Sequence, residues 1–481
     1  MNFRAIGAVI GFLLMFCGVA MSLGIPFSLY YHSGDAHALG ITSAGSFLSG
    51  LFLYLLFRKH RHNIKLREGV FLVATGWIIL STVGAFPFLL FGVFDNFTDA
   101  FFEMISGFTT TSATTLDSIE ILPHGLLFWR SIAHWIGGMG MIVLSLAILP
   151  MLGIGGMQMY SAEVPGPTPD KLSPRIKQTA ALLWTVYAAV SGVLTVLLMF
   201  GGMNLFDALC HTFGTMGTGG CSTRDAGLAF YNSEYINVLV TVFMIIAGMN
   251  IATQFRILRG ELSLLWTGSE IRFYFGLLAT VSVIVVTYRW IMGTDMTGAM
   301  LSDSVFHVVS IATTSAFVNT DFSAWGSMMV FVFFLLMFTG ACAGSTSGSM
   351  KSIRILVLFK AAFAEIKRLV HPHAVIPVRV NKRALTPDVV GRIFAFFMVY
   401  LASFVTASFV MMLLGLSMYD AFGAVAAMLG NIGLGFAGDS LTNEYSHIPM
   451  LGKWVLAFCM VLGRLEFFTL LLILSPTFWK K

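Results

Sequence analysis

Four polar stretches, each in a segment between two apolar runs, hold the residues of this sequence whose types and spacing could do chemistry. They are rich in Gly, Ser, Thr and Asn, and in each the third residue follows an aspartate by 13 positions. The pairs are Asp99 and Ser112, Asp207 and Gly220, Asp303 and Ala316, and Asp420 and Gly433. Rings of backbone carbonyls can replace the hydration shell of a potassium ion, so we expect these stretches to bind a monovalent cation.

The residues expected to form this site are three consecutive positions from each stretch, and no other metal site is expected. Stretch 1 is Thr110, Thr111 and Ser112; stretch 2 is Thr218, Gly219 and Gly220; stretch 3 is Thr314, Ser315 and Ala316; stretch 4 is Asn431, Ile432 and Gly433. A single polar stretch between apolar runs is ordinarily a connecting loop, but four at one spacing indicate a fourfold internal repeat.

Each aspartate opens a short helix pattern that ends at the polar stretch. We expect the aspartate to be the N-cap of a loop helix of about nine residues, which is too short to cross a membrane. Irregular backbone at membrane depth persists only where it is buried in protein or lines a water-filled cavity. The partially negative C-terminal ends of four such helices would favour a cation on their shared axis.

The composition places these loops in a membrane protein. Hydrophobic residues make up 57% of the 481 residues, charged residues only 11%, and the mean hydropathy is +0.85. A soluble domain would carry about 25% charged residues. We read the first two apolar runs as retained helices rather than a cleaved signal peptide. About ten runs could span: 6–23, 39–57, 70–91, 126–152, 180–200, 236–258, 273–291, 330–360, 393–416 and 454–474.

The charges alternate between successive connecting segments. Lys and Arg gather in segments 58–67, 153–178, 256–272 and 351–392, which hold five, three, three and nine of them. The alternate segments 92–130, 201–235, 292–327 and 417–453 hold three Lys or Arg and fourteen acidic residues. The positive-inside rule therefore places the basic segments and both termini in the cytoplasm. Membrane lipid is an expected partner; nucleic acid is not, because no contiguous basic face with aromatic residues appears.

Two features inside apolar runs point to mechanism. The small-residue segment 339–349 interrupts one run, and Gly340, Gly344 and Gly348 disfavour a continuous helix there. Their spacing also fits a GxxxG packing face, but we expect a break, with Lys351 continuing into the cytoplasm. Arg464 lies in the middle of the last run, where a cation costs about 3 kcal/mol. It is expected either to join a structural ion pair or to form an electrostatic barrier in the pore.

Other polar residues are assigned structural roles. The five cysteines include no CxxC pair and are expected to pack as small residues. His211 and His307 occupy matching positions, four after their aspartates, where packing is favoured over a proton or metal role. The sequence contains no paired nucleophile and base, no zinc-binding HExxH and no phosphate-binding P-loop, so an enzyme is not expected.

Several motifs resemble one family over essentially the full chain. They are GGMG at 137–140, LPMLGIGGM at 149–157, PGP at 165–167, GST at 344–346, GRLE at 463–466 and SPTFW at 475–479. With the four stretches, they make the chain resemble the TrkH/KtrB/HKT superfamily of potassium transporters, and within it the bacterial TrkH family. Each filter stretch of that superfamily has a signature glycine, which Gly220 and Gly433 match. Ser112 and Ala316 depart from it, and serine at the first position accompanies Na+ transport in the plant members.

The resemblance implies a gate, partners and a location. It implies a homodimer with one pore per subunit in the bacterial cytoplasmic membrane, with K+ as the transported ion and no bound cofactor. It also implies a TrkA-like cytoplasmic regulatory subunit that carries the nucleotide and docks on segments 153–178 and 351–392. The residues implied for a gate below the filter are Gly340, Gly344, Ser345, Gly348, Lys351 and Arg464.

The expected fold is an all-α integral membrane protein with two leading helices and four pseudo-symmetric helix, re-entrant loop, helix repeats around one pore. The leading helices take residues 1–66, and the repeats take 67–170, 171–262, 263–370 and 371–481. The expected function is potassium uptake driven by membrane potential, with coupling to H+ or Na+, as in a symporter, left open. The alternatives are a sodium or poorly selective transporter of this fold and a carrier for an organic solute. A carrier would ordinarily show inverted repeats, whereas these four share one orientation.

Overall fold

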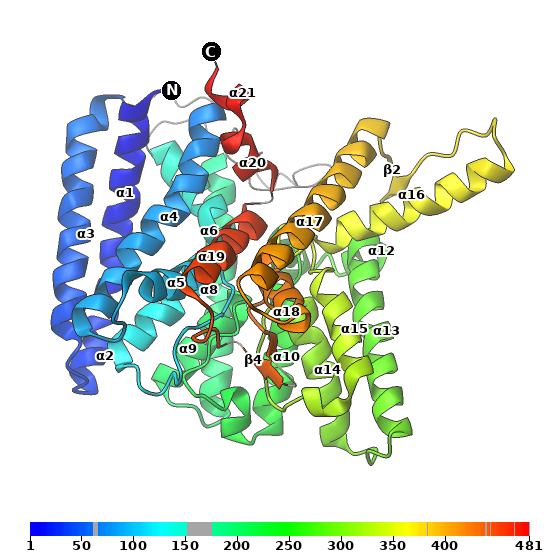
Figure 1. Ribbon diagram of the computed structural model, residues 1–481, viewed down its shortest axis with the longest axis horizontal. Helices are drawn as coiled ribbons and strands as arrows, with labels where there is room; N and C mark the ends of the chain where they lie inside the picture. Colours follow the sequence, from blue (N-terminus) through cyan, green and yellow to red (C-terminus); the bar gives the residue numbers. More distant parts are fainter. Residues whose placement is uncertain are drawn as a thin grey trace.

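The computed structural model describes residues 1–60, 66–151, 176–381, 383–437, 440–442, 444–465 and 467–480. Within these ranges the regular structure is almost entirely helical, which confirms the predicted all-α fold class (Figure 1). The strands there form two short antiparallel hairpins, β1 (Arg379–Val380) with β2 (Arg383–Ala384) and β3 (Gly435–Ala437) with β4 (Ser440–Thr442).

The first helices form a tight pair at one edge of the molecule. Helices α1 (Phe3–Ser22) and α3 (Ala36–Phe57) lie side by side, joined through the short α2 (Ile25–Tyr30) (Figure 1). A Cβ on Gly11 would lie 2.6 Å from the carbonyl oxygen of Gly50, so only glycine permits this approach. The hydroxyl of Ser46 adds a 2.8 Å hydrogen bond to the carbonyl of Leu14.

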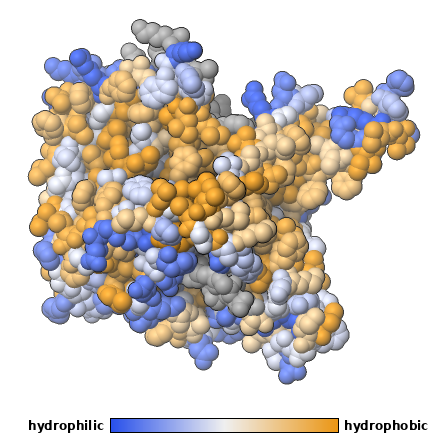
Figure 2. All heavy atoms as spheres, viewed as in Figure 1, coloured by the Kyte–Doolittle hydropathy of each residue, from blue (hydrophilic) through white to orange (hydrophobic). Residues whose placement is uncertain are grey.

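Six helices in the described residues are long and apolar enough to cross a membrane. They are α1, α3, α4 (Leu66–Phe91), α8 (Ile176–Phe200), α13 (Ser269–Ile291) and α17 (Pro387–Leu413). Helix α6 (His124–Met151) covers another predicted run and changes direction at Gly140, whose φ is 53°. Figure 2 shows hydrophobic side chains over most of one face, with hydrophilic ones gathered mainly toward its two ends. Such a surface suits a surrounding bilayer.

Three of the predicted runs are broken rather than continuous. The run 236–258 consists of α10 (Glu234–Ala247) and α11 (Ile251–Leu258), which meet at a bend of 108°. The prediction of one helix was wrong because the Asn250 side chain caps α11, accepting from the N–H groups of Ala252 and Thr253.

The other two breaks lie at segment 339–349 and next to Arg464, the two features that the sequence linked to gating. Helices α15 (Ser327–Met337) and α16 (Ser352–Val370) flank the small-residue segment, so the predicted break is present. Helices α19 (Met450–Arg464), α20 (Phe468–Leu474) and α21 (Pro476–Trp479) replace the last run. Arg464 is therefore the last residue of a helix, not the middle of one.

Four shorter helices precede the four polar stretches. They are α5 (Phe97–Phe108), α9 (Leu205–Met216), α14 (Gly298–Ala312) and α18 (Met418–Leu429), with 12, 12, 15 and 12 residues. They are thus longer than the nine residues predicted. The remaining helical turns are η1 (Arg58–His60), η2 (Gly227–Tyr231), η3 (Ser323–Trp325) and α12 (Leu264–Thr267).

The prediction that the aspartates cap these helices was wrong. The N-caps are Asn96, Asn204, Thr297 and Ser417. In three helices the aspartate lies three residues after the cap and accepts a hydrogen bond from the cap side chain; for example, Asn204 Nδ2 donates to Asp207 Oδ2 at 3.0 Å. The acid therefore holds the third helical position, as in a capping box, and accepts from the side chain of the cap rather than being the cap itself. Asp303 lies further inside its helix and accepts instead from Asn319 Nδ2 at 2.9 Å.

Candidate ion pore

The four polar stretches share one backbone conformation. In each, the first and third residues have positive φ. The values are 57° and 66° for Thr110 and Ser112, 53° and 57° for Thr218 and Gly220, 59° and 57° for Thr314 and Ala316, and 51° and 80° for Asn431 and Gly433. Non-glycine residues rarely adopt this region, so its recurrence at the same positions sets these stretches apart from ordinary loops.

The N–H groups of the stretches turn back toward their own helices. The middle residue of each donates to a carbonyl five positions earlier at 2.8 Å: Thr111 to Ser106, Gly219 to Gly214, Ser315 to Ser310 and Ile432 to Ala427. Because N–H and C=O point in opposite directions across a trans peptide, the carbonyls of the preceding residues point away from the helices. Four such carbonyls are oxygen ligands of the kind that a K+ filter uses.

Neighbouring stretches are in close contact. A Cβ on Gly220 would lie 1.8 Å from the carbonyl oxygen of Ser315, and a Cβ on Gly433 would lie 1.8 Å from that of Thr111. Asn431 Nδ2 also donates to Thr111 Oγ1 at 3.1 Å. Stretch 2 thus packs on stretch 3, and stretch 4 packs on stretch 1. Ser112 and Ala316 carry a Cβ in the same left-handed conformation, which strains their backbone.

A cavity of about 500 Å³ opens over the third residues of stretches 1 to 3. Four carboxylates lie in its wall: Asp117, Asp225, Asp321 and Glu444. The three aspartates follow Ser112, Gly220 and Ala316 by five positions each, so they repeat with the stretches. Asp225 also holds the wall together, because it accepts from Ser118 Oγ and from the N–H of Ile119, both at 2.6 Å.

These carboxylates should attract cations to the cavity. We expect the pair of substitutions Asp117→Asn and Asp321→Asn to slow cation uptake by about tenfold at low ionic strength, because a charged cleft concentrates its counter-ion. The difference should shrink as salt screens the exposed charges. Initial uptake rates measured at several ionic strengths check this. Asp295→Asn, an exposed acid that does not line the cavity, is the control, and equal salt dependence in all proteins would contradict the prediction.

The small-residue segment 339–349 lies against the inner ends of the stretches. The N–H of Gly348 donates to Thr314 Oγ1 at 2.9 Å, and Thr346 Oγ1 donates to the carbonyl of Met216 at 3.1 Å. A Cβ on Gly348 would lie 2.2 Å from the carbonyl oxygen of Gly430. The segment therefore contacts the ends of three loop-helix units, in a position that can obstruct an ion path.

The other side of this segment docks on the break between α10 and α11. Asn250 Nδ2 donates to the carbonyl of Ala343 at 2.7 Å, and the N–H of Ile251 donates to that of Gly344 at 3.2 Å. A Cβ on Gly344 would lie 2.5 Å from Asn250 Nδ2, and both Gly340 and Gly344 have positive φ. These glycines therefore serve close contacts and turns rather than a GxxxG helix face.

Lys351 and Arg464 both bind backbone carbonyls around this segment. Lys351 Nζ donates to the carbonyl of Ser345 at 3.5 Å and bonds the carbonyl of Ser347. Arg464 Nη1 donates to the carbonyl of Thr346 at 2.8 Å, and its Nη2 donates to that of Gly138 at 3.0 Å and to that of Gly137. Arg464 thus joins α19, the small-residue segment and α6.

The predicted gate residues meet in one place, and the GGMG motif meets them there. A Cβ on Gly137 would lie 2.0 Å from the carbonyl oxygen of Phe108, and one on Gly138 would lie 2.5 Å from the Cα of Gly217. Glycine at these positions lets α6 approach the ends of α5 and α9.

Comparison with known proteins identifies the family of this chain. A family model described as "TrkH: Cation transport protein" matches residues 39–481. The chain belongs to the TrkH family. It is 40% identical to the Trk system potassium uptake protein TrkH of Escherichia coli K12 and 37% identical to that of Halomonas elongata, with all of each chain covered. The crystal structure of the potassium transporter TrkH from Vibrio parahaemolyticus superimposes with a TM-score of 0.90 at 35% identity, covering both chains completely.

Membership of the TrkH family makes the chain a membrane-embedded transporter and not an enzyme. Most of the motif at 149–157, the motif at 165–167 and the expected docking segment 153–178 up to residue 175 lie outside the described residues, as does Glu466.

His211, His307 and the cysteines other than Cys221 have the structural surroundings expected of packing residues. His211 Nδ1 contacts the carbonyl of Asp207 at 2.8 Å, and its Nε2 contacts Ser222 Oγ at 3.1 Å. His307 bonds the carbonyl of Asp303 and packs among the rings of Phe322 and Trp325. All five cysteines are free and buried.

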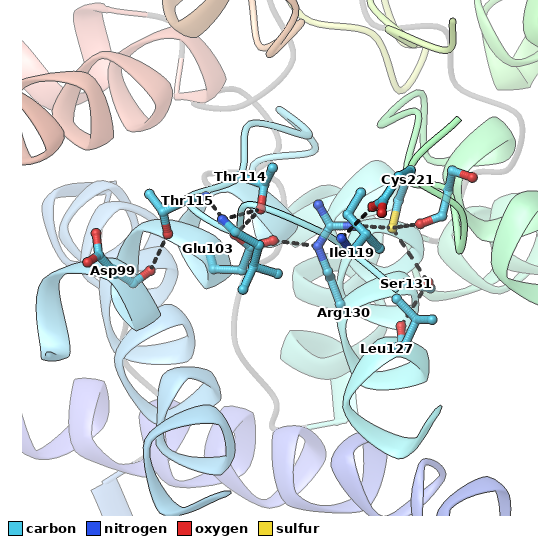
Figure 3. Close-up of polar contacts among 12 residues, drawn as sticks. Asp99, Glu103, Thr114, Thr115, Ile119, Leu127, Arg130, Ser131 and Cys221 are labelled. Carbon is cyan, nitrogen blue, oxygen red and sulfur yellow. Dashed lines mark hydrogen bonds and ion pairs between the residues drawn. The ribbon is translucent and has the colours of Figure 1, made fainter. Parts of the chain in front are cut away.

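The sequence reasoning missed one buried polar network of this TrkH-family chain. Glu103 and Arg130 form an ion pair behind stretch 1, and Arg130 also reaches Cys221, which follows stretch 2 (Figure 3). A signal was available, because Glu103 lies four residues after its aspartate, the position that His211 and His307 hold in their own segments. Arg130 is also one of only three Lys or Arg residues in segments 92–130, 201–235, 292–327 and 417–453, which are otherwise rich in acidic residues, and this rarity was a second signal.

Proposed function

We propose that the chain takes up potassium through a central pore surrounded by four helix, re-entrant loop, helix repeats. The repeats are residues 67–170, 171–262, 263–370 and 371–481, after two leading helices in residues 1–66. The observation that carries the proposal is the recurring pair of left-handed residues in the four stretches, whose N–H groups turn back and whose carbonyls turn away. The relatives from Escherichia coli and Halomonas elongata are potassium uptake proteins, which supports the choice of ion.

We further propose that the small-residue segment 339–349 is the gate and that Arg464 holds it closed. Its contacts with Thr314, Gly430 and Met216 support a position directly beneath the filter. The guanidinium of Arg464 makes two contributions. Its hydrogen bond to the carbonyl of Thr346 fixes the segment, and its positive charge repels a cation in the pore.

A regulatory partner and a homodimer complete the proposal. The relatives are named as components of a Trk system, which supports a TrkA-like cytoplasmic subunit that would carry the nucleotide. Four of the nine basic residues of 351–392, namely Arg354, Lys360, Lys367 and Arg368, lie on α16, which projects away from the other helices (Figure 1). Both termini lie at one end of the molecule, which supports a multi-pass protein with both termini in the cytoplasm of a bacterium (Figure 1).

The second candidate is a sodium or poorly selective transporter of the same fold. Ser112 and Ala316 favour it, because their side chains occupy a conformation that glycine adopts without strain. If their Cβ atoms distort the filter, the variant Ser112→Gly with Ala316→Gly should raise the ratio of K+ to Na+ flux severalfold. Parallel flux assays with the two ions check this, and an unchanged ratio would remove Ser112 and Ala316 as determinants of ion preference.

Growth of a bacterium without its own potassium uptake systems tests the proposed function. Expression of this chain with its regulatory partner should restore growth at limiting K+ but not at limiting concentrations of an amino acid or sugar. Failure to restore growth, with the protein present in the membrane, would contradict the proposal.

A further inference from the structure

We propose that Glu103, Arg130 and Cys221 form a brace behind stretches 1 and 2 that sets the preference for K+ over Na+. This inference rests on the proposed function and adds positioning residues to the same filter. The three side chains come from different elements: Glu103 from α5, Arg130 from α6 and Cys221 from the chain after stretch 2 (Figure 3).

The carboxylate of Glu103 holds the outer end of stretch 1. Its Oε2 accepts from Thr114 Oγ1 at 2.8 Å and from the N–H of Thr115 at 3.2 Å. These residues follow Ser112 by two and three positions. The bonds therefore fix the course of the chain directly after the strained third residue of stretch 1.

The guanidinium of Arg130 connects this carboxylate to stretch 2. Its Nε donates to Glu103 Oε1 at 2.5 Å, and its Nη1 donates to Cys221 Sγ at 2.8 Å. Cys221 directly follows Gly220, the third residue of stretch 2. The fork of donors on arginine can reach both partners at once, which a lysine ammonium at the end of a single stem cannot reproduce.

The burial of this group separates it from ordinary ion pairs. The side chain of Arg130 is 1% exposed and that of Glu103 is 0% exposed. Two charges in such a place are costly to desolvate, and an apolar pair of similar volume would often be at least as stable. A role in fixing one conformation explains their presence better than a gain in stability does.

The other loop helices place uncharged contacts at the equivalent position. His211 reaches Ser222, two residues after Gly220, whereas His307 packs among aromatic rings and Ala424 has no polar side chain. Of these four matching positions, the one behind stretch 1, which has serine as its third residue, is the one with a charged side chain. Asp207 and Asp303 support the chain after stretches 2 and 3 from a different position, through Thr223 and Asn319. Backbone strain persists only where surrounding contacts over-determine it, and the brace supplies such contacts for Ser112.

The brace would act on selectivity through the positions of the carbonyls. Discrimination between K+ and Na+ depends on the size of the cavity and on the number and field of its oxygen ligands. Releasing stretch 1 or separating it from stretch 2 would let these oxygens approach the smaller ion. The expected effect is therefore on the ratio of the two fluxes and not only on protein stability.

Three substitutions in purified protein in liposomes test the brace. Glu103→Gln removes the charge at nearly constant shape, Arg130→Lys keeps the charge but loses the fork, and Cys221→Ala leaves the ion pair intact but removes its link to stretch 2. We expect each to lower the ratio of K+ to Na+ flux by about tenfold, since each removes or weakens a hydrogen bond to a charged group.

A second ion pair in the same region provides the control. Lys453 Nζ bonds Asp99 Oδ1 at 2.5 Å and joins α19 to α5, and this bond is made to the first turn of α5 rather than to a residue of a stretch. Lys453→Gln should lower the Tm without changing the flux ratio. If Glu103→Gln does not fold, Cys221→Ala still shows whether the brace affects the flux ratio, because this substitution leaves no unpaired charge. An unchanged ratio in folded Cys221→Ala and Arg130→Lys proteins would overturn the brace alone. An unmodified protein that carries no K+, also when the regulatory partner is added, would overturn the proposed function and the brace with it.

Discussion

Alanine in place of Gly433 is expected to abolish potassium uptake. The substituted Cβ would lie 1.8 Å from the carbonyl oxygen of Thr111 and 2.7 Å from the nitrogen of Ala113. Both contacts are with backbone, so neither can be relieved by a side-chain rotation. Stretch 4 or stretch 1 must move, and the proposed filter loses the close contact that positions its carbonyls. Uptake of radioactive Rb+ or K+ into cells or liposomes checks this.

A matched glycine separates crowding from backbone strain. Gly92 has a φ of 83°, close to the 80° of Gly433, but a Cβ there would meet nothing within 4 Å. Gly92→Ala should therefore keep most of the uptake, whereas Gly220→Ala, with its Cβ 1.8 Å from the oxygen of Ser315, should behave like Gly433→Ala. Normal uptake by Gly433→Ala would contradict the contact between stretches 4 and 1.

Replacing Arg464 by glutamine should raise potassium flux through the protein without its regulatory partner by about tenfold or more. The change removes a unit charge, worth on the order of 2 kcal/mol to a cation nearby in a medium of intermediate dielectric. It also removes donors to the carbonyls of Thr346 and Gly138, which hold the small-residue segment in place. Flux into liposomes under a fixed membrane potential measures the effect.

Two further variants show which contribution of Arg464 matters. Arg464→Lys keeps the charge but cannot bridge the carbonyls of Thr346 and Gly138. An intermediate flux would therefore show that both the charge and the hydrogen bonds contribute. Arg392→Gln changes an exposed charge outside the pore and should leave the flux of the isolated protein unchanged. A flux from Arg464→Gln equal to or below that of the unmodified protein would remove Arg464 from the gate.

Local patterns made much of this site predictable. The constant distance from each aspartate to its stretch located all four loops, because a repeat imposes the same local conformation on each copy. Clusters of small residues predicted the break at 339–349, since glycine weakens a helix wherever it occurs. Apolar runs predicted the spanning helices because hydropathy, like a cluster of glycines, is a property of the segment itself and does not depend on distant contacts.

Features that depend on distant contacts could not be predicted. The break at Asn250 is stabilised by the carbonyl of Ala343, which lies far along the chain. The aspartates were assigned as caps because they open the helix pattern, but for three of them the Asn or Ser three residues earlier was equally suited to the role, and for Asp303 the cap is Thr297, six residues earlier. The repeat marks the position of Glu103, but its pairing with Arg130 requires the packing of α5 on α6, which no local pattern reveals.

Cation flux into liposomes that contain this protein alone, compared for K+, Rb+, Na+ and Li+, tests the central claim most directly. A pore lined by four sets of carbonyls should pass K+ and Rb+ well above Na+ and Li+, even with Ser112 and Ala316 in the filter. Equal flux of K+ and Na+ would contradict a potassium-selective filter, and absence of flux of every ion, also when the regulatory partner is added, would contradict the pore itself.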